Sequence, residues 1–110
     1  MSKVKLNHEF LNLLCKSKPK FQKSLINNAS KGQIDSICEI ILNILNGNLK
    51  VSEVEFNRLN LKKSLLRTLI KRGPLKKKKY LIQRGGFLQV LIPSIIAGLA
   101  TVISSIIEKA

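Results

Sequence analysis

Apolar side chains recur at intervals of three and four residues along most of the chain, a spacing that predicts α-helices. The pattern is strongest over residues 33–46, where the apolar positions are Ile34, Ile37, Cys38, Ile41 and Leu45, with Ile40, Leu42 and Ile44 alongside. The polar residues between them, from Asp35 to Asn46, recur with a period of about 3.6 residues, which fits a helix and not a strand. We therefore expect the central helix of a bundle here, ending at Gly47.

Further helices are predicted on both sides of this segment. Residues 8–16 form a short helix that ends before Pro19, and Pro19 begins another because proline is tolerated in a first turn. Ser52 is an expected N-cap, and its helix runs to the stop signal Arg72-Gly73-Pro74. Residues 1–7 are polar and are expected to fray. The prediction is an all-α protein with a bundle of about four helices over residues 6–72.

The C-terminal part has no charged residue from Phe87 to Ile107. As a helix it would be about 30 Å long, the thickness of the hydrocarbon core of a bilayer. It is expected to span a membrane, to lie on a membrane or a partner protein, or to fold back as the last core helix. Pro93 and the lack of a broad polar face favour the first two alternatives over the third. The residues assigned to membrane or partner contact, self-association included, are Phe87, Leu88, Leu91, Ile92, Ile95, Leu99, Val102, Ile103 and Ile106.

Composition adds a large positive charge to this picture. The 20 Lys and Arg residues exceed the 6 Asp and Glu residues, which gives a net charge of +14. The excess lies entirely within residues 1–86, because residues 87–110 carry one basic and one acidic residue. Such an excess indicates a polyanionic partner, either nucleic acid or an anionic membrane surface.

The basic residues concentrate towards the end of the charged part. Lys63, Arg67 and Lys71 share one face of a predicted helix, which is either a solvated face or a stripe that follows phosphates. The lysines at 76–79 repel one another, so residues 74–86 are expected to be a mobile basic connector with a Gly85-Gly86 hinge between domains 1–73 and 87–110. The predicted nucleic-acid contacts are Lys62, Lys63, Arg67, Lys71, Arg72, Lys76, Lys77, Lys78, Lys79 and Arg84.

Candidate catalytic or metal-binding chemistry is not visible in the sequence. His8 is the only histidine, and neither Cys15 nor Cys38 has metal-ligand spacing with it. The acids are scattered, and no glycine-rich phosphate loop occurs. We expect a protein that is not an enzyme, with no cofactor and no metal. Two cysteines indicate a reduced, intracellular environment. A disulfide between them is the alternative.

The sequence after the lysine run resembles a viral family. Arg84-Gly85-Gly86-Phe87-Leu88, followed by Leu91-Ile92-Pro93 and an Ile/Ala/Gly-rich stretch, is similar to the end of adenovirus core protein X, the precursor of the DNA-condensing peptide mu. The Asn46-Gly47-Asn48 turn and the lysine run also resemble the X-like proteins of Polinton (Maverick) transposons and adintoviruses. The resemblance to adenovirus covers about the last 35 residues.

What the resemblance implies is a virion core protein, present in the virion and the host nucleus, that condenses double-stranded DNA. It also implies processing by the viral cysteine protease after Gly85-Gly86. The position three residues before the second glycine is Gln83, where the adenovirus enzyme prefers Met, Ile or Leu. The sequence therefore leaves undecided whether the chain is cleaved after Gly86. The chain departs from mu in its helical body and in having lysine in place of most of the arginine, which makes phosphate contacts point-like.

The favoured function is thus a non-enzymatic virion core or minor capsid protein that binds double-stranded DNA phosphates without sequence specificity, while its tail contacts capsid or membrane. Two alternatives belong to other classes. One is a membrane-disrupting entry factor that its lysines dock on anionic lipid. The other is a helical protein-interaction module whose charge is incidental.

Overall fold

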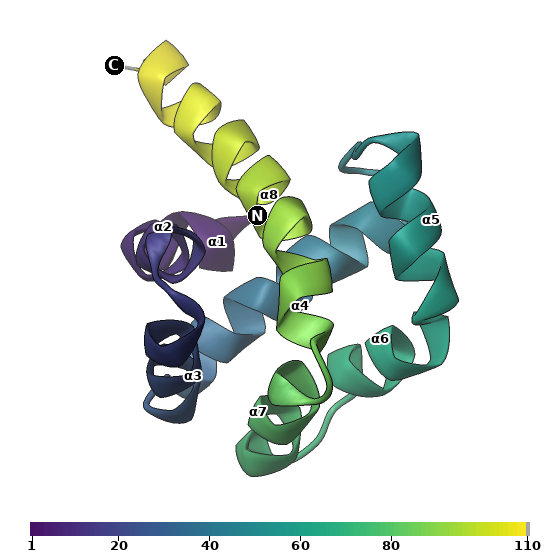
Figure 1. Ribbon diagram of the computed structural model, residues 1–110. Helices are drawn as coiled ribbons and strands as arrows, with labels where there is room; N and C mark the ends of the chain where they lie inside the picture. The colour runs from purple at the N-terminus through teal and green to yellow at the C-terminus, as the bar shows by residue number, and fades with distance from the viewer. Residues whose placement is uncertain (110) are drawn as a thin grey trace.

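Every regular element among the residues that the structure describes is a helix. The structure, a computed structural model, describes the backbone of residues 1–109 and the side chains of residues 1–104. The helices are α1 (Ser2–Leu6), α2 (His8–Lys16), α3 (Pro19–Asn27), α4 (Lys31–Leu45), α5 (Glu53–Leu61), α6 (Lys63–Ile70), α7 (Leu75–Gln83) and α8 (Phe87–Lys109) (Figure 1). No strand occurs within these residues, so the all-α prediction is confirmed.

Local signals explain several of the boundaries. Pro19 occupies the first turn of α3, as predicted. The side chain of Ser52 accepts a hydrogen bond of 3.2 Å from the backbone N–H of Glu55, which confirms it as the N-cap of α5. Ser30 forms a reciprocal capping box with Gln33 at the start of α4. Helices α3, α4 and α5 therefore begin close to where the sequence places them.

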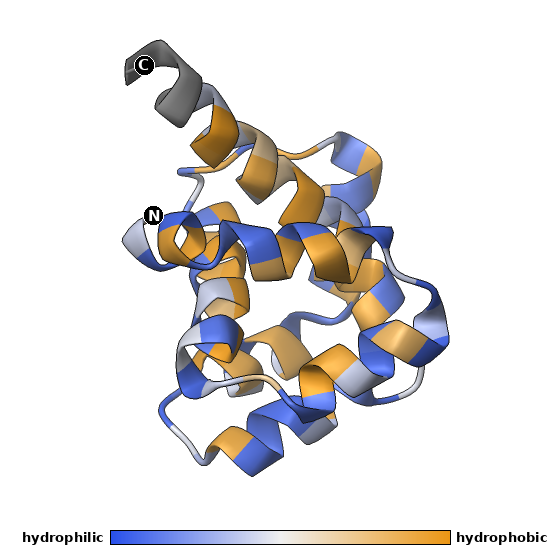
Figure 2. Ribbon diagram, turned by 90° about the vertical axis from the view of Figure 1, so that its left-hand side faces the viewer, coloured by the Kyte–Doolittle hydropathy of each residue, from blue (hydrophilic) through white to orange (hydrophobic). Residues whose placement is uncertain are grey.

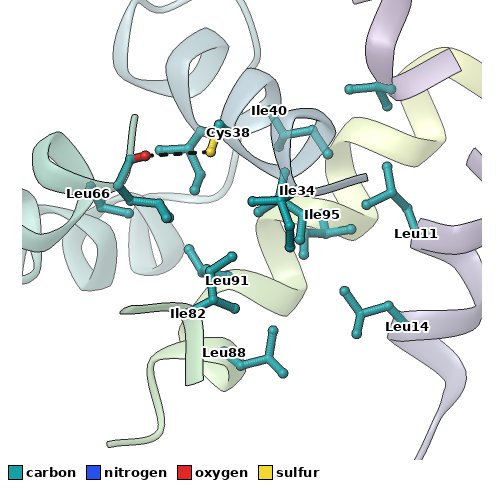
Figure 3. Close-up of a cluster of buried hydrophobic side chains, with 14 of the residues drawn as sticks. Leu11, Leu14, Ile34, Cys38, Ile40, Leu66, Ile82, Leu88, Leu91 and Ile95 are labelled. Atoms are coloured by element: carbon teal, nitrogen blue, oxygen red, sulfur yellow. Dashed lines mark hydrogen bonds between the residues drawn. The ribbon is translucent and has the colours of Figure 1, made fainter. Parts of the chain in front are cut away.

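Helix α4 is the centre of the bundle, as its apolar pattern predicts. It packs against α1, α2, α6, α7 and α8. Its buried side chains include Ile34, Ile37, Ile40 and Ile41, which are essentially inaccessible to solvent. Figure 3 shows Ile34 and Ile40 of α4 among side chains contributed by α2, α6, α7 and α8. The core is therefore assembled from both ends of the chain around one helix.

Helix α8 crosses α4 and packs against α1, α2, α5 and α7 as well (Figure 1). The crossing is close at Gly98, where an added Cβ atom would lie 2.8 Å from Cδ1 of Ile40. Only glycine fits this approach without a shift of Ile40, because real Cβ atoms are not found at such distances. A buried polar contact joins α8 to α5, since the Ser94 hydroxyl donates a 3.0 Å hydrogen bond to Oε1 of Glu55.

The N-terminal half of the chain departs from prediction in two places. Residues 1–7 do not fray, because Ser2–Leu6 forms α1 and Val4 is fully buried against the core. The single helix predicted from Ser52 to Arg72 is two helices, since the backbone at Lys62 leaves the helical region with φ −106° and ψ 21°. The bend turns α6 so that Leu66 and Leu69 enter the core. Six helices replace the predicted four over residues 1–73.

The predicted division into a domain, a mobile connector and a separate tail is not what the structure shows. Residues 75–83 form α7, whose Leu81 and Ile82 are buried in the same core as α4. The radius of gyration is 13.0 Å, close to the value of about 13 Å expected for one compact domain of this length. Apolar residues of the connector and the tail complete the bundle, because helices α1–α6 alone would leave α4 partly uncovered.

Candidate nucleic-acid interface

The four consecutive lysines are divided between two faces of α7. Lys77 and Lys78 lie towards the loop that joins α6 to α7, where they line a hollow of about 130 Å³. Lys76 and Lys79 instead line a shallow hollow of about 600 Å³ on the side of α3, with Asn27 and Tyr80. Figure 2 shows α7 at the bottom of the molecule as largely hydrophilic and α8 as largely hydrophobic. The run is therefore not one uniform binding element.

Lys79 has a structural partner that the sequence does not reveal. Its ammonium group donates a 2.9 Å hydrogen bond to the carbonyl oxygen of Asn27, the last residue of α3. Gln83 donates a 2.6 Å hydrogen bond to the side-chain oxygen of the same asparagine. A cation at a helix C-terminus is favourable because the carbonyl groups there carry partial negative charge. Lys79 thus helps to hold α7 against α3.

Half of the residues that line the small hollow between α6 and α7 are cations. Its lining residues are Thr68, Lys71, Arg72, Gly73, Pro74, Lys77, Lys78 and Leu81. Four of the predicted DNA contacts, Lys71, Arg72, Lys77 and Lys78, meet here, and no carboxylate lines the hollow. We call these four residues the corner cluster. Lys71 and Arg72 lie in the loop that follows α6, and Lys77 and Lys78 lie in the first turn or so of α7.

A larger hollow of about 520 Å³ adjoins the corner cluster and has a mixed charge. Arg72 and Lys78 line both hollows, and here they face Asp35 and Glu39 of α4. Lys3 of α1 and Lys31 of α4 belong to the same lining. These two lysines were not among the predicted contacts, and no local sequence signal could have placed them beside residues 72–78. The two acids make this hollow a weaker anion site than its neighbour.

Asp35 forms ion pairs with two of these cations. Its Oδ2 atom lies 2.8 Å from Nζ of Lys31 and 3.9 Å from Nζ of Lys3. Burial acts to raise the pKa of Asp35, but the hydrogen bond from Lys31 and the charges of Lys31, Lys3 and Lys78 together lower it below its usual value. The carboxylate therefore stays charged at neutral pH and offsets part of the positive charge on the α1–α4 side of the surface.

The other predicted DNA contacts are also at the surface. Lys62, Lys63, Arg67, Lys76 and Arg84 are exposed. Among the side chains that the structure describes, none of the predicted DNA-binding cations lies within 4.0 Å of a carboxylate oxygen. Their charge is thus available to an external anion. Lys62 and Lys63 are at the α5–α6 bend, one end of a basic surface that continues along α6 to the corner cluster.

The residues predicted to contact membrane or a partner are mostly inside the bundle, which corrects that prediction. Phe87, Leu88, Leu91, Ile95, Leu99 and Val102 are buried. Ile92 is half-buried, Ile103 is exposed, and the side chain of Ile106 lies outside the described residues. The physical reason is that helices α1, α2, α4, α5 and α7 supply the apolar partners that a lipid or second protein would otherwise provide.

Composition alone does not distinguish α8 from a membrane span. The stretch Phe87–Ser104 is the one segment among the described residues that is long and apolar enough to cross a bilayer, with a mean hydropathy of 2.0. The core helix of a soluble protein passes the same test. Of its outward-facing apolar side chains, Ile96 and Ile103 are the large ones that remain exposed.

Gly85 and Gly86 form the turn between α7 and α8. Their φ angles are +47° and +76°, in the left-handed region that glycine adopts at low cost. Both residues are exposed, and an added Cβ atom at either would meet no neighbour within 4 Å. This candidate processing site is therefore a surface turn, but a cut there would separate α8 from a core of which it is part.

The remaining reactive groups do not assemble into a second site. Burial raises the pKa of the Cys15 thiol to about 11, and it also raises the pKa of Cys38, so both thiols are protonated at neutral pH. Both cysteines are free, and Cys38 donates a 3.7 Å hydrogen bond to the carbonyl oxygen of Leu69 (Figure 3). Within the described residues, no three His, Cys, Asp or Glu side chains come together as metal ligands.

Comparisons with known proteins add no relative. No protein-family model, no curated protein and no solved structure matches the chain.

Proposed function

We propose that the protein binds double-stranded DNA through its phosphates, without sequence specificity, as a non-enzymatic virion core or minor capsid protein. The observation that carries the DNA-binding part is the corner cluster, where cations of the α6–α7 loop and of α7 surround one hollow with no carboxylate in its lining. The virion assignment rests on the resemblance of the C-terminal segment to adenovirus core protein X.

Electrostatics favours an anionic partner for this surface. Like charges around one hollow repel one another, and a chain with a net charge of +14 repels itself further. A polyanion relieves this repulsion and releases the counterions condensed on its own phosphates. Lysine is the main cation here, so the contacts are to phosphate charge and not to base edges.

The distribution of charge over the molecule also supports condensation. Exposed lysines occur on α1, α2 and α3 as well as at the corner cluster, and they include Lys5, Lys16, Lys18, Lys20 and Lys23. Cations on more than one face allow one molecule to contact two duplexes. Condensation of DNA requires such bridging together with neutralisation of phosphate charge.

The test is the affinity of the full-length protein for a short DNA duplex as a function of salt. We expect the logarithm of the association constant to fall with the logarithm of salt at a slope of roughly −5, which corresponds to about six neutralised phosphates. Two duplexes of unrelated sequence should give the same slope and affinity. Weak binding that does not respond to salt, or strong preference for one sequence, would contradict the proposal. The full chain is required because removal of residues 87–110 would take away part of the core.

A further inference from the structure

The hollow inside the corner cluster has the size of a site for a single small anion. Its volume is about 130 Å³, room for roughly four water molecules at ~30 Å³ each. Pockets for nucleotides or other drug-sized ligands usually measure about 300–1,000 Å³, so a whole nucleotide does not fit. A tetrahedral phosphate group with part of its hydration shell does.

The lining supplies charge and hydrogen-bond donors from two directions. Lys71 and Arg72 approach from the end of α6, and Lys77 and Lys78 approach from α7. The hydroxyl of Thr68 already donates a 2.9 Å hydrogen bond to the carbonyl oxygen of Ser64, so the donors towards an anion are the four cations. Arg72 is the only guanidinium of the cluster, and its planar group can hold two phosphate oxygens at once.

The neighbouring helix start adds to this positive potential. Pro74 precedes α7, which has no side-chain cap and no acidic residue in its first turn. Acids are favoured at this position in most helices because the first N–H groups carry partial positive charge. Here the first turn carries lysines instead, so the helix start itself adds no negative charge beside the corner cluster.

We propose that the corner cluster seats one phosphate group of the nucleic-acid backbone, with Arg72 and Lys77 as its principal contacts. This inference rests on the proposed DNA binding for the source of the phosphate. It goes beyond that function because it assigns unequal roles to the lysine run. Lys77 and Lys78 hold the phosphate at a defined place, whereas Lys76 and Lys79 lie on the opposite side of α7 and contribute general attraction only.

The first experiment uses inorganic phosphate and the full-length protein. Amide chemical shifts are followed by NMR during titration with sodium phosphate at pH 7, with sodium chloride at the same ionic strength as the control. We expect saturable shifts at Thr68, Lys71 to Gly73 and Lys77, present in Lys76→Gln and lost in Arg72→Gln. Small, non-saturating shifts spread over all exposed lysines, equal in phosphate and chloride, would overturn the inference.

The second experiment compares adjacent lysines that carry the same charge. Lys77→Gln should lower duplex affinity about eightfold at 0.1 M salt and reduce the salt slope by about 0.9, because one phosphate contact is lost. Lys76→Gln, the matched control, should change the affinity by less than about twofold, since its charge acts only at a distance. Circular dichroism confirms that both variants fold.

The outcomes separate this inference from the function on which it rests. If both variants lose affinity equally, the proposed DNA binding is supported and the proposed phosphate site at the corner cluster is contradicted. If the wild-type protein binds no duplex, the proposed function fails, while the phosphate titration still decides whether the seat exists. If Lys77→Gln leaves DNA affinity unchanged but weakens sedimentation with phosphatidylserine vesicles, the seat belongs to lipid and the assignment to nucleic acid is overturned.

Discussion

Whether a single side chain in this bundle is buried depends on partners far away in the sequence. The apolar pattern of residues 19–27 assigns Phe21 to the inner face, yet Phe21 is 67% exposed and its neighbour Gln22 is buried. Gln22 donates a 3.0 Å hydrogen bond to the carbonyl oxygen of Leu14 and accepts one of 2.9 Å from Gln89. Burial of an amide is tolerable only with such partners, and Gln89 of α8 cannot be foreseen from the sequence around α3.

Asp35 gives a prediction at the same scale. Because the pKa of Asp35 is lowered in the folded protein, its carboxylate stabilises the fold at pH values above the pKa of an aspartate in the unfolded chain, about 3.9. That contribution is lost as the pH falls through the lowered pKa. We expect Asp35→Asn to be less stable than the wild type in urea unfolding at pH 7, and the difference to shrink towards pH 3. A difference that stays constant with pH would show that the charge of Asp35 is not responsible.

Among the helices, α8 is the one that sequence reasoning placed least well. The prediction of a helix from Phe87 is confirmed. Its small residues Ser94 and Gly98 are buried together with the large residues Leu91 and Ile95. An apolar helix without charge suits a membrane or a core equally. The deciding fact is the uncovered apolar surface of α4, which appears only when the other helices are in place.

Two adjacent isoleucines of α8 test this placement. Ile95 is fully buried and Ile96 is 51% exposed, so they differ in surroundings and not in chemistry. We expect Ile95→Ala to lower the free energy of unfolding by about 2–5 kcal/mol, because it leaves a cavity in the core. Ile96→Ala should change it by less than about 1 kcal/mol. Denaturant unfolding of both variants, followed by circular dichroism, is the measurement. Equal and small effects would mean that α8 does not belong to the core.

At the scale of the whole molecule, the charged residues are known from the sequence, but their grouping on the folded surface is not. The pattern of apolar residues is sufficient for an all-α bundle centred on α4, since a period near ~3.6 needs no tertiary information. The splitting of the lysine run between two faces depends on how α7 rotates to bury Leu81 and Ile82. The meeting of Lys71 and Arg72 with Lys77 and Lys78 depends on the turn at Gly73-Pro74.

The central claim is that DNA binds at the corner cluster and is not held merely by the overall charge. It is tested most directly by two full-length variants with the same net charge. One changes the corner cluster to glutamine at Lys71, Arg72, Lys77 and Lys78. The other changes four exposed lysines that line none of the hollows described above, at Lys5, Lys18, Lys20 and Lys23.

The salt dependence of duplex binding is then measured for both variants and the wild type. Loss of the phosphate contact at the corner cluster should reduce the slope by about 0.9 in the corner variant, while the control variant keeps the wild-type slope to within a few tenths. The account predicts this difference. Equal reductions in the two variants would contradict it, because binding would then follow net charge and not the surface that α6 and α7 form.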